Sequence, residues 1–356
     1  MSEDFSINMQ RFRVNNETGE KTRDLFWEQM GASSGDTNAM VQLGVAYLQG
    51  DGVEQDVEIA SAWFEWAAEH ENSWGMYNLA VLYGHGYGIE RSFEKALHWM
   101  EKAAELDEGG ADAGAEMYRT FIESRKAAET GNPDAMGKYA GNLMAHGNMI
   151  NPEAAVIDYQ EAFEWATKAA EAGSPDGMYT LALSYERGRY VEQNIQEAAK
   201  WHKKAADLNY GAAQYNLGCI YLREESMKDH MPEVIDLFKQ AAENGNTLGL
   251  HGISKCYELG LGVEADHDKA IEWGEKAAEK IAELGFNATG DYATQHTQSS
   301  SDLNVLYELA KLYTDEDENG KMINAERARY WLSKAAEKGH QKAQFMLNFT
   351  PLWEKQ

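Results

Sequence analysis

A short phrase built around two adjacent alanines recurs eight times along this chain of 356 residues. The steps between the first alanines of successive copies are 36, 24, 42, 36, 36, 36 and 58 residues, so a period of 36 dominates. A fixed period of this length indicates stacked structural units, each of which buries its apolar face against its neighbours. The first alanines of the eight pairs are Ala67, Ala103, Ala127, Ala169, Ala205, Ala241, Ala277 and Ala335.

Each unit carries the pattern of two amphipathic helices, which we name helix A and helix B. In helix A, a leucine or isoleucine is followed four residues later by a tyrosine, as in Leu217 and Tyr221. In helix B, an alanine, a tryptophan and the alanine pair follow one another at spacings of three and four, as in Ala198, Trp201 and Ala205. These spacings place the apolar residues on one helix face. We therefore expect the tryptophans to pack in the core with the leucines, tyrosines and alanines.

The sequence resembles the Sel1-like repeat family, which is related to the tetratricopeptide repeats. The resemblance lies in Ala213-Gln-Tyr-Asn-Leu-Gly218 with Tyr221, in Gly260-Leu-Gly-Val263, and in Asp268-Lys-Ala-Ile-Glu-Trp273 followed by Lys276-Ala-Ala-Glu279. It extends over about residues 36–348. The resemblance implies an all-α fold, a right-handed superhelical solenoid of antiparallel helix pairs that acts as an adaptor or scaffold for other proteins.

The spacing of the repeats predicts one elongated domain and its internal boundaries. We expect no β-sheet, and we expect glycine pairs such as Gly50-Asp-Gly52, Gly86-Tyr-Gly88 and Gly260-Leu-Gly262 to end the A helices. The expected parts are a polar leader (1–21), an N-terminal helical cap (22–35), the solenoid (36–340) and a C-terminal capping helix (341–356). Within the solenoid, 109–131 is a degenerate unit with a long helix over Ala111–Glu129, and 285–302 is a polar loop insertion.

The composition argues against several classes of function. The net charge of −27, from 59 acidic and 32 basic residues, disfavours nucleic acid as a partner. It suits either a solvated surface or electrostatic steering toward a basic protein. No apolar stretch approaches the roughly 18 residues of a membrane span, and no signal peptide is visible at Met1. The two cysteines, Cys219 and Cys256, lie in helix A patterns. We therefore predict a cytoplasmic protein.

Patterns that are typical of enzymes are weak in this sequence. Ser92-Phe-Glu-Lys95 fits the Ser-x-x-Lys pattern of penicillin-recognising enzymes, but it falls on the regular start of a B helix. The ten histidines are scattered singly. We therefore expect no catalytic residues and a protein–protein interaction scaffold that binds a partner segment. Two alternatives stay open: an acidic inhibitor or immunity-type protein that neutralises a basic partner, and a hydrolase of the kind claimed for some relatives of the family.

A row of tyrosine and amide side chains is the candidate surface for a protein or peptide partner. On helix A, the residues one and two positions before the core leucine lie about 100–160° away from it around the helix. Amides can bond an extended main chain, and tyrosines supply contact area. The alternative is that the tyrosines pack between successive A helices. The candidates are Tyr77, Asn78, Tyr179, Tyr215, Asn216, His251 and Tyr307.

Residues 315–326 match the calcium loop of EF-hands, D-x-[DN]-x-[DN]-G-x5-E. Asp315, Asp317 and Asn319 offer side-chain oxygens, Lys321 offers its main-chain carbonyl, and Glu326 can bind through both carboxylate oxygens. The segment therefore predicts a Ca²⁺ ion as cofactor.

The surroundings of this loop both favour and weaken the calcium prediction. The loop lies between an expected helix A (Val305–Tyr313) and an expected helix B (Ala325–Glu337), where it replaces the usual turn. However, Thr314 stands where EF-hands prefer an apolar residue, Ile323 offers no ligand, and the loop is single. The alternative is an acidic, solvated turn.

Overall fold

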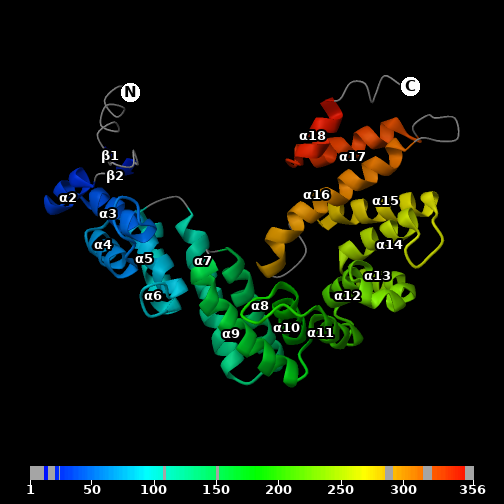
Figure 1. The fold of residues 1–356 in the computed structure, drawn as a ribbon, viewed down its shortest axis with the longest axis horizontal. Helices are drawn as coiled ribbons and strands as arrows, with labels where there is room; N and C mark the ends of the chain where they lie inside the picture. The colour runs from blue at the N-terminus through cyan, green and yellow to red at the C-terminus, as the bar shows by residue number, and fades with distance from the viewer. Residues whose placement is uncertain are drawn as a thin grey trace. The chain divides into compact units, whose positions relative to one another are not determined.

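The computed structural model describes residues 12–14, 21–23, 25–106, 110–149, 152–284, 292–315 and 323–348 (Figure 1). Apart from two short strands, β1 (Phe12–Val14) and β2 (Lys21–Arg23), these residues form helices and the turns between them. The helices are α2 (Phe26–Ser33), α3 (Thr37–Gln49), α4 (Val57–Glu69), α5 (Ser73–His85), α6 (Phe93–Leu106), α7 (Ala111–Glu129), α8 (Pro133–Met149), α9 (Pro152–Glu171), α10 (Pro175–Arg187), α11 (Ile195–Asp207), α12 (Gly211–Arg223), the 3-10 helix η2 (Glu225–Glu233), α13 (Val234–Glu243), α14 (Thr247–Leu259), α15 (His267–Leu284), α16 (Tyr292–Thr314), α17 (Ala325–Glu337) and α18 (Gln341–Asn348).

The chain divides into two compact units, which we describe separately. The N-terminal unit consists of residues 1–127 with 151–157, and the C-terminal unit consists of residues 128–150 with 158–356. From α2 to α6 in the first unit, and from α10 to α18 in the second, each α-helix packs against the next one along the chain. This order of contacts is that of a helical solenoid, so the prediction of an all-α solenoid is confirmed.

The helix ends follow from local sequence. At the start of α11, the side chain of Asn194 accepts a hydrogen bond from the main-chain nitrogen of Glu197, and Asp56 caps α4 in the same way. The A helices α3, α5 and α14 end at Gly50, Gly86 and Gly260, whose φ angles are 70°, 65° and 67°. Only glycine adopts this left-handed conformation without strain, so the predicted turns are confirmed.

Successive repeats are held together by a close approach between helix B and the following helix A. A Cβ atom placed on Gly177, in the first turn of α10, would lie 2.4 Å from the Cβ of Ala169 in α9. The same contact joins Gly75 in α5 to Ala67 in α4, at 2.7 Å. The alanine pair therefore recurs because a larger side chain would separate the two helix backbones.

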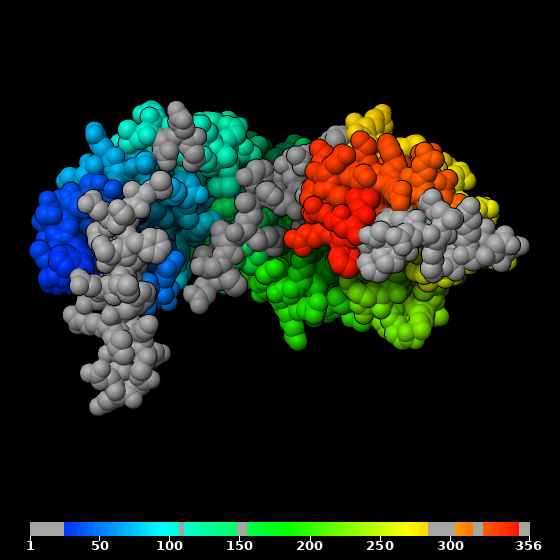
Figure 2. Space-filling model, turned by 90° about the horizontal axis from the view of Figure 1, so that it is seen from above, coloured from blue at the N-terminus to red at the C-terminus, as the bar shows by residue number. Residues whose placement is uncertain are grey.

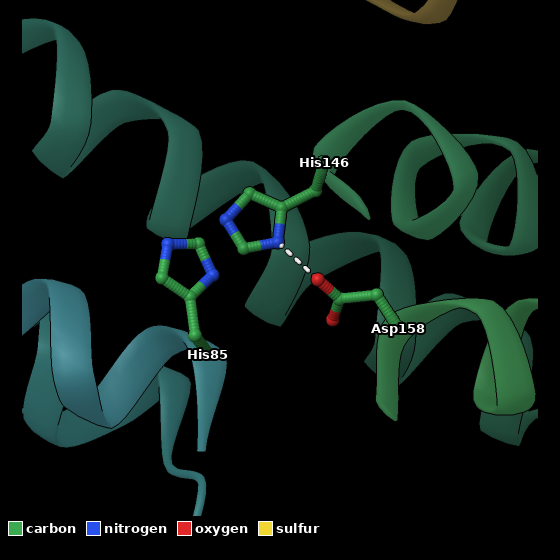
Figure 3. A group of neighbouring side chains, drawn as sticks. All are labelled: His85, His146 and Asp158. Atoms are coloured by element: carbon green, nitrogen blue, oxygen red, sulfur yellow. Dashed lines mark hydrogen bonds and ion pairs between the residues drawn. The ribbon is translucent and has the colours of Figure 1, made fainter. Parts of the chain in front are cut away.

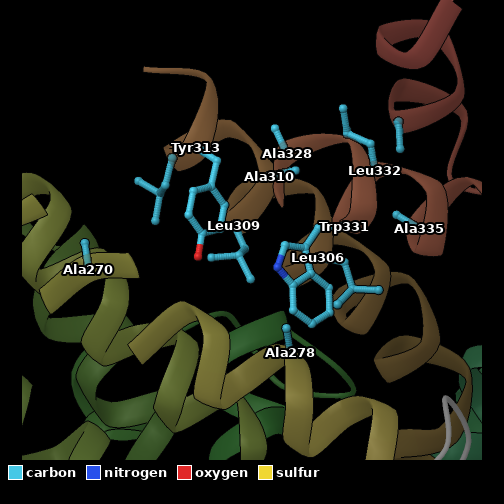
Figure 4. Packing of buried hydrophobic residues seen from close by; sticks show 12 residues of the cluster. Ala270, Ala278, Leu306, Leu309, Ala310, Tyr313, Ala328, Trp331, Leu332 and Ala335 are labelled. Atoms are coloured by element: carbon cyan, nitrogen blue, oxygen red, sulfur yellow. The ribbon is translucent and has the colours of Figure 1, made fainter. Parts of the chain in front are cut away.

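The core of the last repeats shows how the stripes of helix A and helix B meet. Leu309 and Tyr313 of α16 face Trp331 and Leu332 of α17, and Ala278 of α15 lies beside them (Figure 4). All five are buried. At the end of this unit α18 packs on α17, as the red and orange surfaces in Figure 2 show.

The expectation that the tryptophans pack in the core is confirmed only in part, because Trp63, Trp165, Trp201 and Trp273 pack against core clusters without being fully buried. Trp331 is 4% exposed, whereas the other five are half-buried. The residue after the tryptophan position points into the core instead, as Phe64 and Leu332 do with 0% exposure. Adjacent residues point about 100° apart around a helix, and the spacing of the pattern alone did not show which of the two faces the core. Lysine side chains cover the half-buried rings in the pairs Trp99/Lys102, Trp165/Lys168, Trp201/Lys204 and Trp273/Lys276.

The polar insertion is another point at which the prediction was wrong. We expected a loop over 285–302, but 292–302 form the first turns of α16, which contacts α8 within the C-terminal unit. The stretch from Tyr292 to Thr314 contains neither glycine nor proline, so nothing in it interrupts a helix. Residues 285–291 lie outside the described part of the chain.

At the N-terminus the structure adds an element that we did not expect. β1 and β2 pair in antiparallel register, with Phe12 opposite Arg23 and Val14 opposite Lys21. Strand β2 also occupies the first residues of the expected helical cap, so the cap helix begins at Phe26. The β-branched residues Val14 and Thr22 favour extended backbone, which we overlooked in a segment interpreted as a polar leader.

Other predicted elements agree with the structure. The long helix of the degenerate unit is α7, over the expected Ala111–Glu129. The C-terminal helix runs from Gln341 to Asn348, and residues 349–356 lie outside the described part. Among the helices of the described residues, none has both the length and the apolar character that crossing a bilayer requires.

The contact between Gly177 and Ala169 predicts a stability effect. Gly177→Ala should lower the free energy of unfolding by about 1–3 kcal/mol, because the added methyl group overpacks the contact between α9 and α10. Gly141→Ala in α8 is the matched control, since its added Cβ would have as its nearest neighbour only Thr180 Oγ1 at 3.7 Å. The control should be neutral or slightly stabilising in the same urea titration. Equal stability of Gly177→Ala and the wild type would contradict the packing account.

Candidate functional site

One side of the A helices in the C-terminal unit carries polar side chains that meet between neighbouring helices. The side-chain nitrogen of Asn216 in α12 donates to the hydroxyl of Tyr179 in α10 at 3.4 Å. Lys255 of α14 donates to a carboxylate oxygen of Glu308 in α16 at 2.9 Å. We name this side the A-helix surface, and it carries Tyr179, Glu186, Tyr215, Asn216, Arg223, His251, Lys255, Tyr307 and Glu308.

The predicted tyrosines of this surface are half-buried and pack against neighbouring rings. The ring of Tyr179 lies 5.6 Å from that of His202 and 5.3 Å from that of Tyr210, which immediately precedes the next helix A. In the last repeat, Tyr307 lies 4.8 Å from His340. Burial also raises the pKa of Tyr215 well above its usual range. These contacts favour the alternative interpretation, in which the tyrosines mainly join one repeat to the next.

The predicted asparagines offer more to a partner than the tyrosines do. In the N-terminal unit, Asn78 donates to the main-chain oxygen of Trp74 at 2.7 Å, and the ring of Tyr77 lies 6.1 Å from that of Trp74. Asn78 and Asn216 are both half-buried. Within the described residues, neither side-chain oxygen accepts a hydrogen bond. Each amide therefore keeps an acceptor for a partner's main-chain N–H.

Charged pairs on this surface were missed in the sequence. Lys255 bonds both Glu258 and Glu308, and Arg223 reaches Glu186 at 3.5 Å. Burial by itself would raise the pKa of Glu308, but hydrogen bonds from lysines outweigh that effect and lower it. The helical register could have indicated this position, because Lys255 lies two residues after the core residue Ile253.

His251 occupies the position at which Tyr179 and Tyr215 stand in the two preceding repeats. Burial, with a smaller contribution from the charge of Lys255, lowers the pKa of His251 to about 4. The imidazole is therefore neutral at physiological pH and can donate and accept one hydrogen bond each.

A second buried histidine lies behind the surface. His202 is completely buried and stands where other B helices carry Phe64 or Leu332. Its Nε2 lies 3.4 Å from a carboxylate oxygen of Glu186, and its Nδ1 has no hydrogen-bond partner among the described residues. Burial lowers the pKa of His202, so the ring is a neutral, polar replacement for a core apolar side chain.

A third histidine, His146, is paired with an aspartate. Nδ1 of His146 in α8 lies 2.8 Å from Oδ2 of Asp158 in α9, and both side chains are buried (Figure 3). The two residues lie on different helices, and their sequence separation therefore gave no sign of the contact. The pair links α8 to α9 inside the C-terminal unit.

The structure describes the two ends of the predicted calcium loop. Main-chain bonds from Ile323 to Asp315 and from Asn324 to Tyr313 close the loop at its base. The bond from Asn324 matches the one from Asp266 to Tyr257 in the regular A–B turn. Glu326 lies in the first turn of α17. The predicted ligands Asp317, Asn319 and Lys321 lie outside the described residues.

The closed base leaves both interpretations of the loop possible. Asp315 is exposed, and one of its carboxylate oxygens lies 3.9 Å from Nδ1 of His267. Acidic residues are also found in the first turn of other B helices, such as Glu58 in α4, where they interact with the helix dipole. Calcium binding therefore stays a prediction.

Comparison with known proteins places these features in a family. Seven segments match the Sel1 repeat, at residues 37–72, 75–108, 133–174, 175–210, 211–246, 248–280 and 305–340. Helix pairs of this kind, stacked through alanines, define a class of α-helical repeat proteins. The chain belongs to the Sel1 repeat family, as its resemblance predicted.

The chain is also similar to solved structures, of which the first named here shares its repeat fold. A protective antigen of uropathogenic Escherichia coli strains, described as displaying an SLR fold, is 26% identical with a TM-score of 0.51, over 94% of this chain and 68% of that one. A Sel1 repeat protein from Oxalobacter formigenes is 25% identical with a TM-score of 0.43, over 91% and 79%. An immunity protein from Pseudomonas aeruginosa is 18% identical with a TM-score of 0.31, over 69% and 82%. No protein with a curated function matches the sequence.

The lowered pKa of His251 predicts a pH effect on stability. Between about pH 6.5 and pH 4 the unfolded chain binds a proton on this histidine that the folded chain does not, so stability falls as pH falls through this window. His251→Tyr should reduce the loss between pH 7 and pH 5 by about 2 kcal/mol. Urea titrations at the two pH values measure this difference, in which any pH-independent effect of the substitution cancels. An unchanged pH dependence would show that His251 titrates normally.

The calcium prediction is tested by thermal melting with millimolar Ca²⁺ and with chelator. An ion that binds only the folded loop should stabilise it by about 2.7 kcal/mol at a hundredfold excess over Kd. Glu326→Gln should abolish the shift, and Glu337→Gln at the other end of α17 should retain it. A midpoint that ignores calcium, or a Glu326→Gln variant with the full shift, would establish the acidic-turn alternative.

Proposed function

We propose that this protein is a non-catalytic scaffold that holds an extended segment of a partner protein on the A-helix surface. Proteins of the Sel1 repeat family generally mediate protein–protein interaction, and typical members are scaffolds without enzymatic activity. The observation that supports this proposal most directly is a pair of half-buried polar contacts between neighbouring A helices, from Asn216 to Tyr179 and from Lys255 to Glu308.

The chemistry of the A-helix surface suits the main chain of a peptide. The amide oxygen of Asn216 can accept from a main-chain N–H group, as can that of Asn78 at the matching position in the N-terminal unit. Around Asn216, the ring of Tyr215 supplies apolar contact area at a small entropic cost, because packing on Phe238 at 5.5 Å already restrains it. Half-burial also strengthens polar contacts, because water competes less for them than at an open surface.

The charge of the partner is a finer part of the proposal. The net charge of −27 would speed the encounter with a basic protein, through an attraction that salt screens. On the A-helix surface itself, Arg223 faces Glu186 and Lys255 faces Glu308, so the local contacts carry both signs. We therefore propose that charge sets the association rate for a basic partner, whereas the amides and rings set the register.

The inhibitor or immunity-type alternative differs from a general scaffold in what binding does to the partner. An inhibitor would abolish the activity of a basic enzyme or toxin, whereas a scaffold would leave it intact. A hydrolase stays the weakest alternative, because no arrangement of described residues that we recognise provides an activated nucleophile. Burial raises the pKa of the Cys219 thiol to about 11, which keeps that thiol protonated. We also propose that this scaffold acts in the cytoplasm.

The binding proposal is tested with a partner captured on the immobilised protein and identified by mass spectrometry. Asn216→Ala and Asn78→Ala should each weaken its binding in calorimetry by about 1–2 kcal/mol, because a main-chain N–H of the partner loses its acceptor. Gln160→Ala, on the exposed side of the B helix α9, should bind like the wild type. If both asparagine variants keep full affinity, the recognition surface lies elsewhere.

A further inference from the structure

A pocket of about 590 Å³ lies in the C-terminal unit between the B helix α11 and the segment η2. Its apolar wall includes Trp201, Tyr221 and Met227, and its rim includes Lys200, Lys203 and Lys204. We name it the lysine–tryptophan pocket. Its volume is within the range of pockets that bind small ligands or anchoring side chains.

The pocket arises from a departure from the repeat. Trp201 with Lys204 repeats the geometry of Trp273 with Lys276, in which the ammonium group lies over the indole ring. The opposite wall, however, comes from η2, which connects helix A to helix B by a 3-10 helix where the neighbouring repeats use a glycine turn. The cavity therefore does not follow from the repeat pattern.

The charge of the rim is opposite to that of the chain as a whole. Three lysines fall within five residues of α11, in a chain with a net charge of −27. Lys200 pairs with Glu197, and Lys203 pairs with Asp207. These lysine side chains are 66% and 48% exposed, and exposed pairs of this kind contribute about 0–1 kcal/mol. A ligand carboxylate can therefore replace their present partners at little cost.

The remaining lining residues are the polar Gln196, Glu197 and Ser226 and a set of groups that supply apolar contact. The ammonium nitrogen of Lys204 lies 3.6 Å from the centre of the Trp201 ring. Opposite it, the ring of His230 is stacked on that of Tyr221, at 4.4 Å. An apolar side chain inserted here would cover aromatic surface and leave the lysines at the rim.

We propose that the lysine–tryptophan pocket binds an acidic peptide segment of a partner protein that carries one aromatic or large aliphatic side chain. The apolar side chain enters between Trp201 and Met227, and flanking carboxylates bind Lys200 and Lys204. Charge complementarity selects this occupant, because a basic segment would meet three lysines. The pocket is formed by a B helix and η2, so this site is separate from the A-helix surface.

The test is selection from a phage-displayed library of random peptides on the full-length protein. Selected sequences should combine Asp or Glu with a Phe, Trp or Leu. The double variant Lys200→Glu, Lys204→Glu should weaken the binding of a selected peptide by about tenfold or more in fluorescence polarisation. Lys276→Glu, Lys280→Glu is the matched control on α15, with the same spacing and the same lysine–tryptophan contact, and it should bind like the wild type.

Several results would overturn the proposal. Selection of no peptide, or of basic peptides, would contradict the predicted chemistry. Equal binding by the Lys200→Glu, Lys204→Glu variant would place the site elsewhere. Full affinity after the aromatic or aliphatic residue of the peptide is changed to alanine would show that the lysines attract acidic chains without using the pocket. Circular dichroism of both double variants separates loss of binding from loss of fold.

Discussion

The close approach of each helix B to the following helix A is the contact on which the rest of the structure depends. The alanine pair and a glycine in the next first turn, as in Ala169 with Gly177, bring two backbones nearer than any larger side chains would allow. This contact fixes how one repeat is stacked on the next. In α12 and α16 the position of this glycine is taken by Ala213 and Val305, which are buried with Ala205 and Ala277 of the preceding B helices. There Asn216 reaches Tyr179 and Lys255 reaches Glu308.

The fold could be predicted from the sequence where one local pattern determines the structure. The helices over Ala111–Glu129 and Ala325–Glu337 and the turns at Gly50 and Gly260 were predicted because spacing and glycine act within a few residues. Predictions failed where contacts with other helices determine the structure. Half-burial of the tryptophans depends on which of two adjacent helical positions faces the core. The His146–Asp158 pair depends on two helices meeting, and α16, which begins with the helical turns over 292–302, contacts α8.

The candidate site was predictable in position but not in chemistry. Helical register placed Tyr215 and Asn216 away from the core, whereas both are half-buried and Tyr215 packs against a core cluster. The register could not show that the tyrosines pack on rings of neighbouring repeats. Positions that depart from the repeat distinguish this chain from a generic solenoid. They include His202 in a core apolar position, His251 in a tyrosine position, and η2 in place of a glycine turn.

The claim that a partner binds the A-helix surface is tested most directly by photo-cross-linking in the complex. A photo-reactive amino acid is placed at Asn216 on the A-helix surface and, in a second protein, at Lys239 on the exposed side of the B helix α13. The account predicts a cross-link to the partner from position 216 and none from position 239. A cross-link from 239 without one from 216 would contradict it.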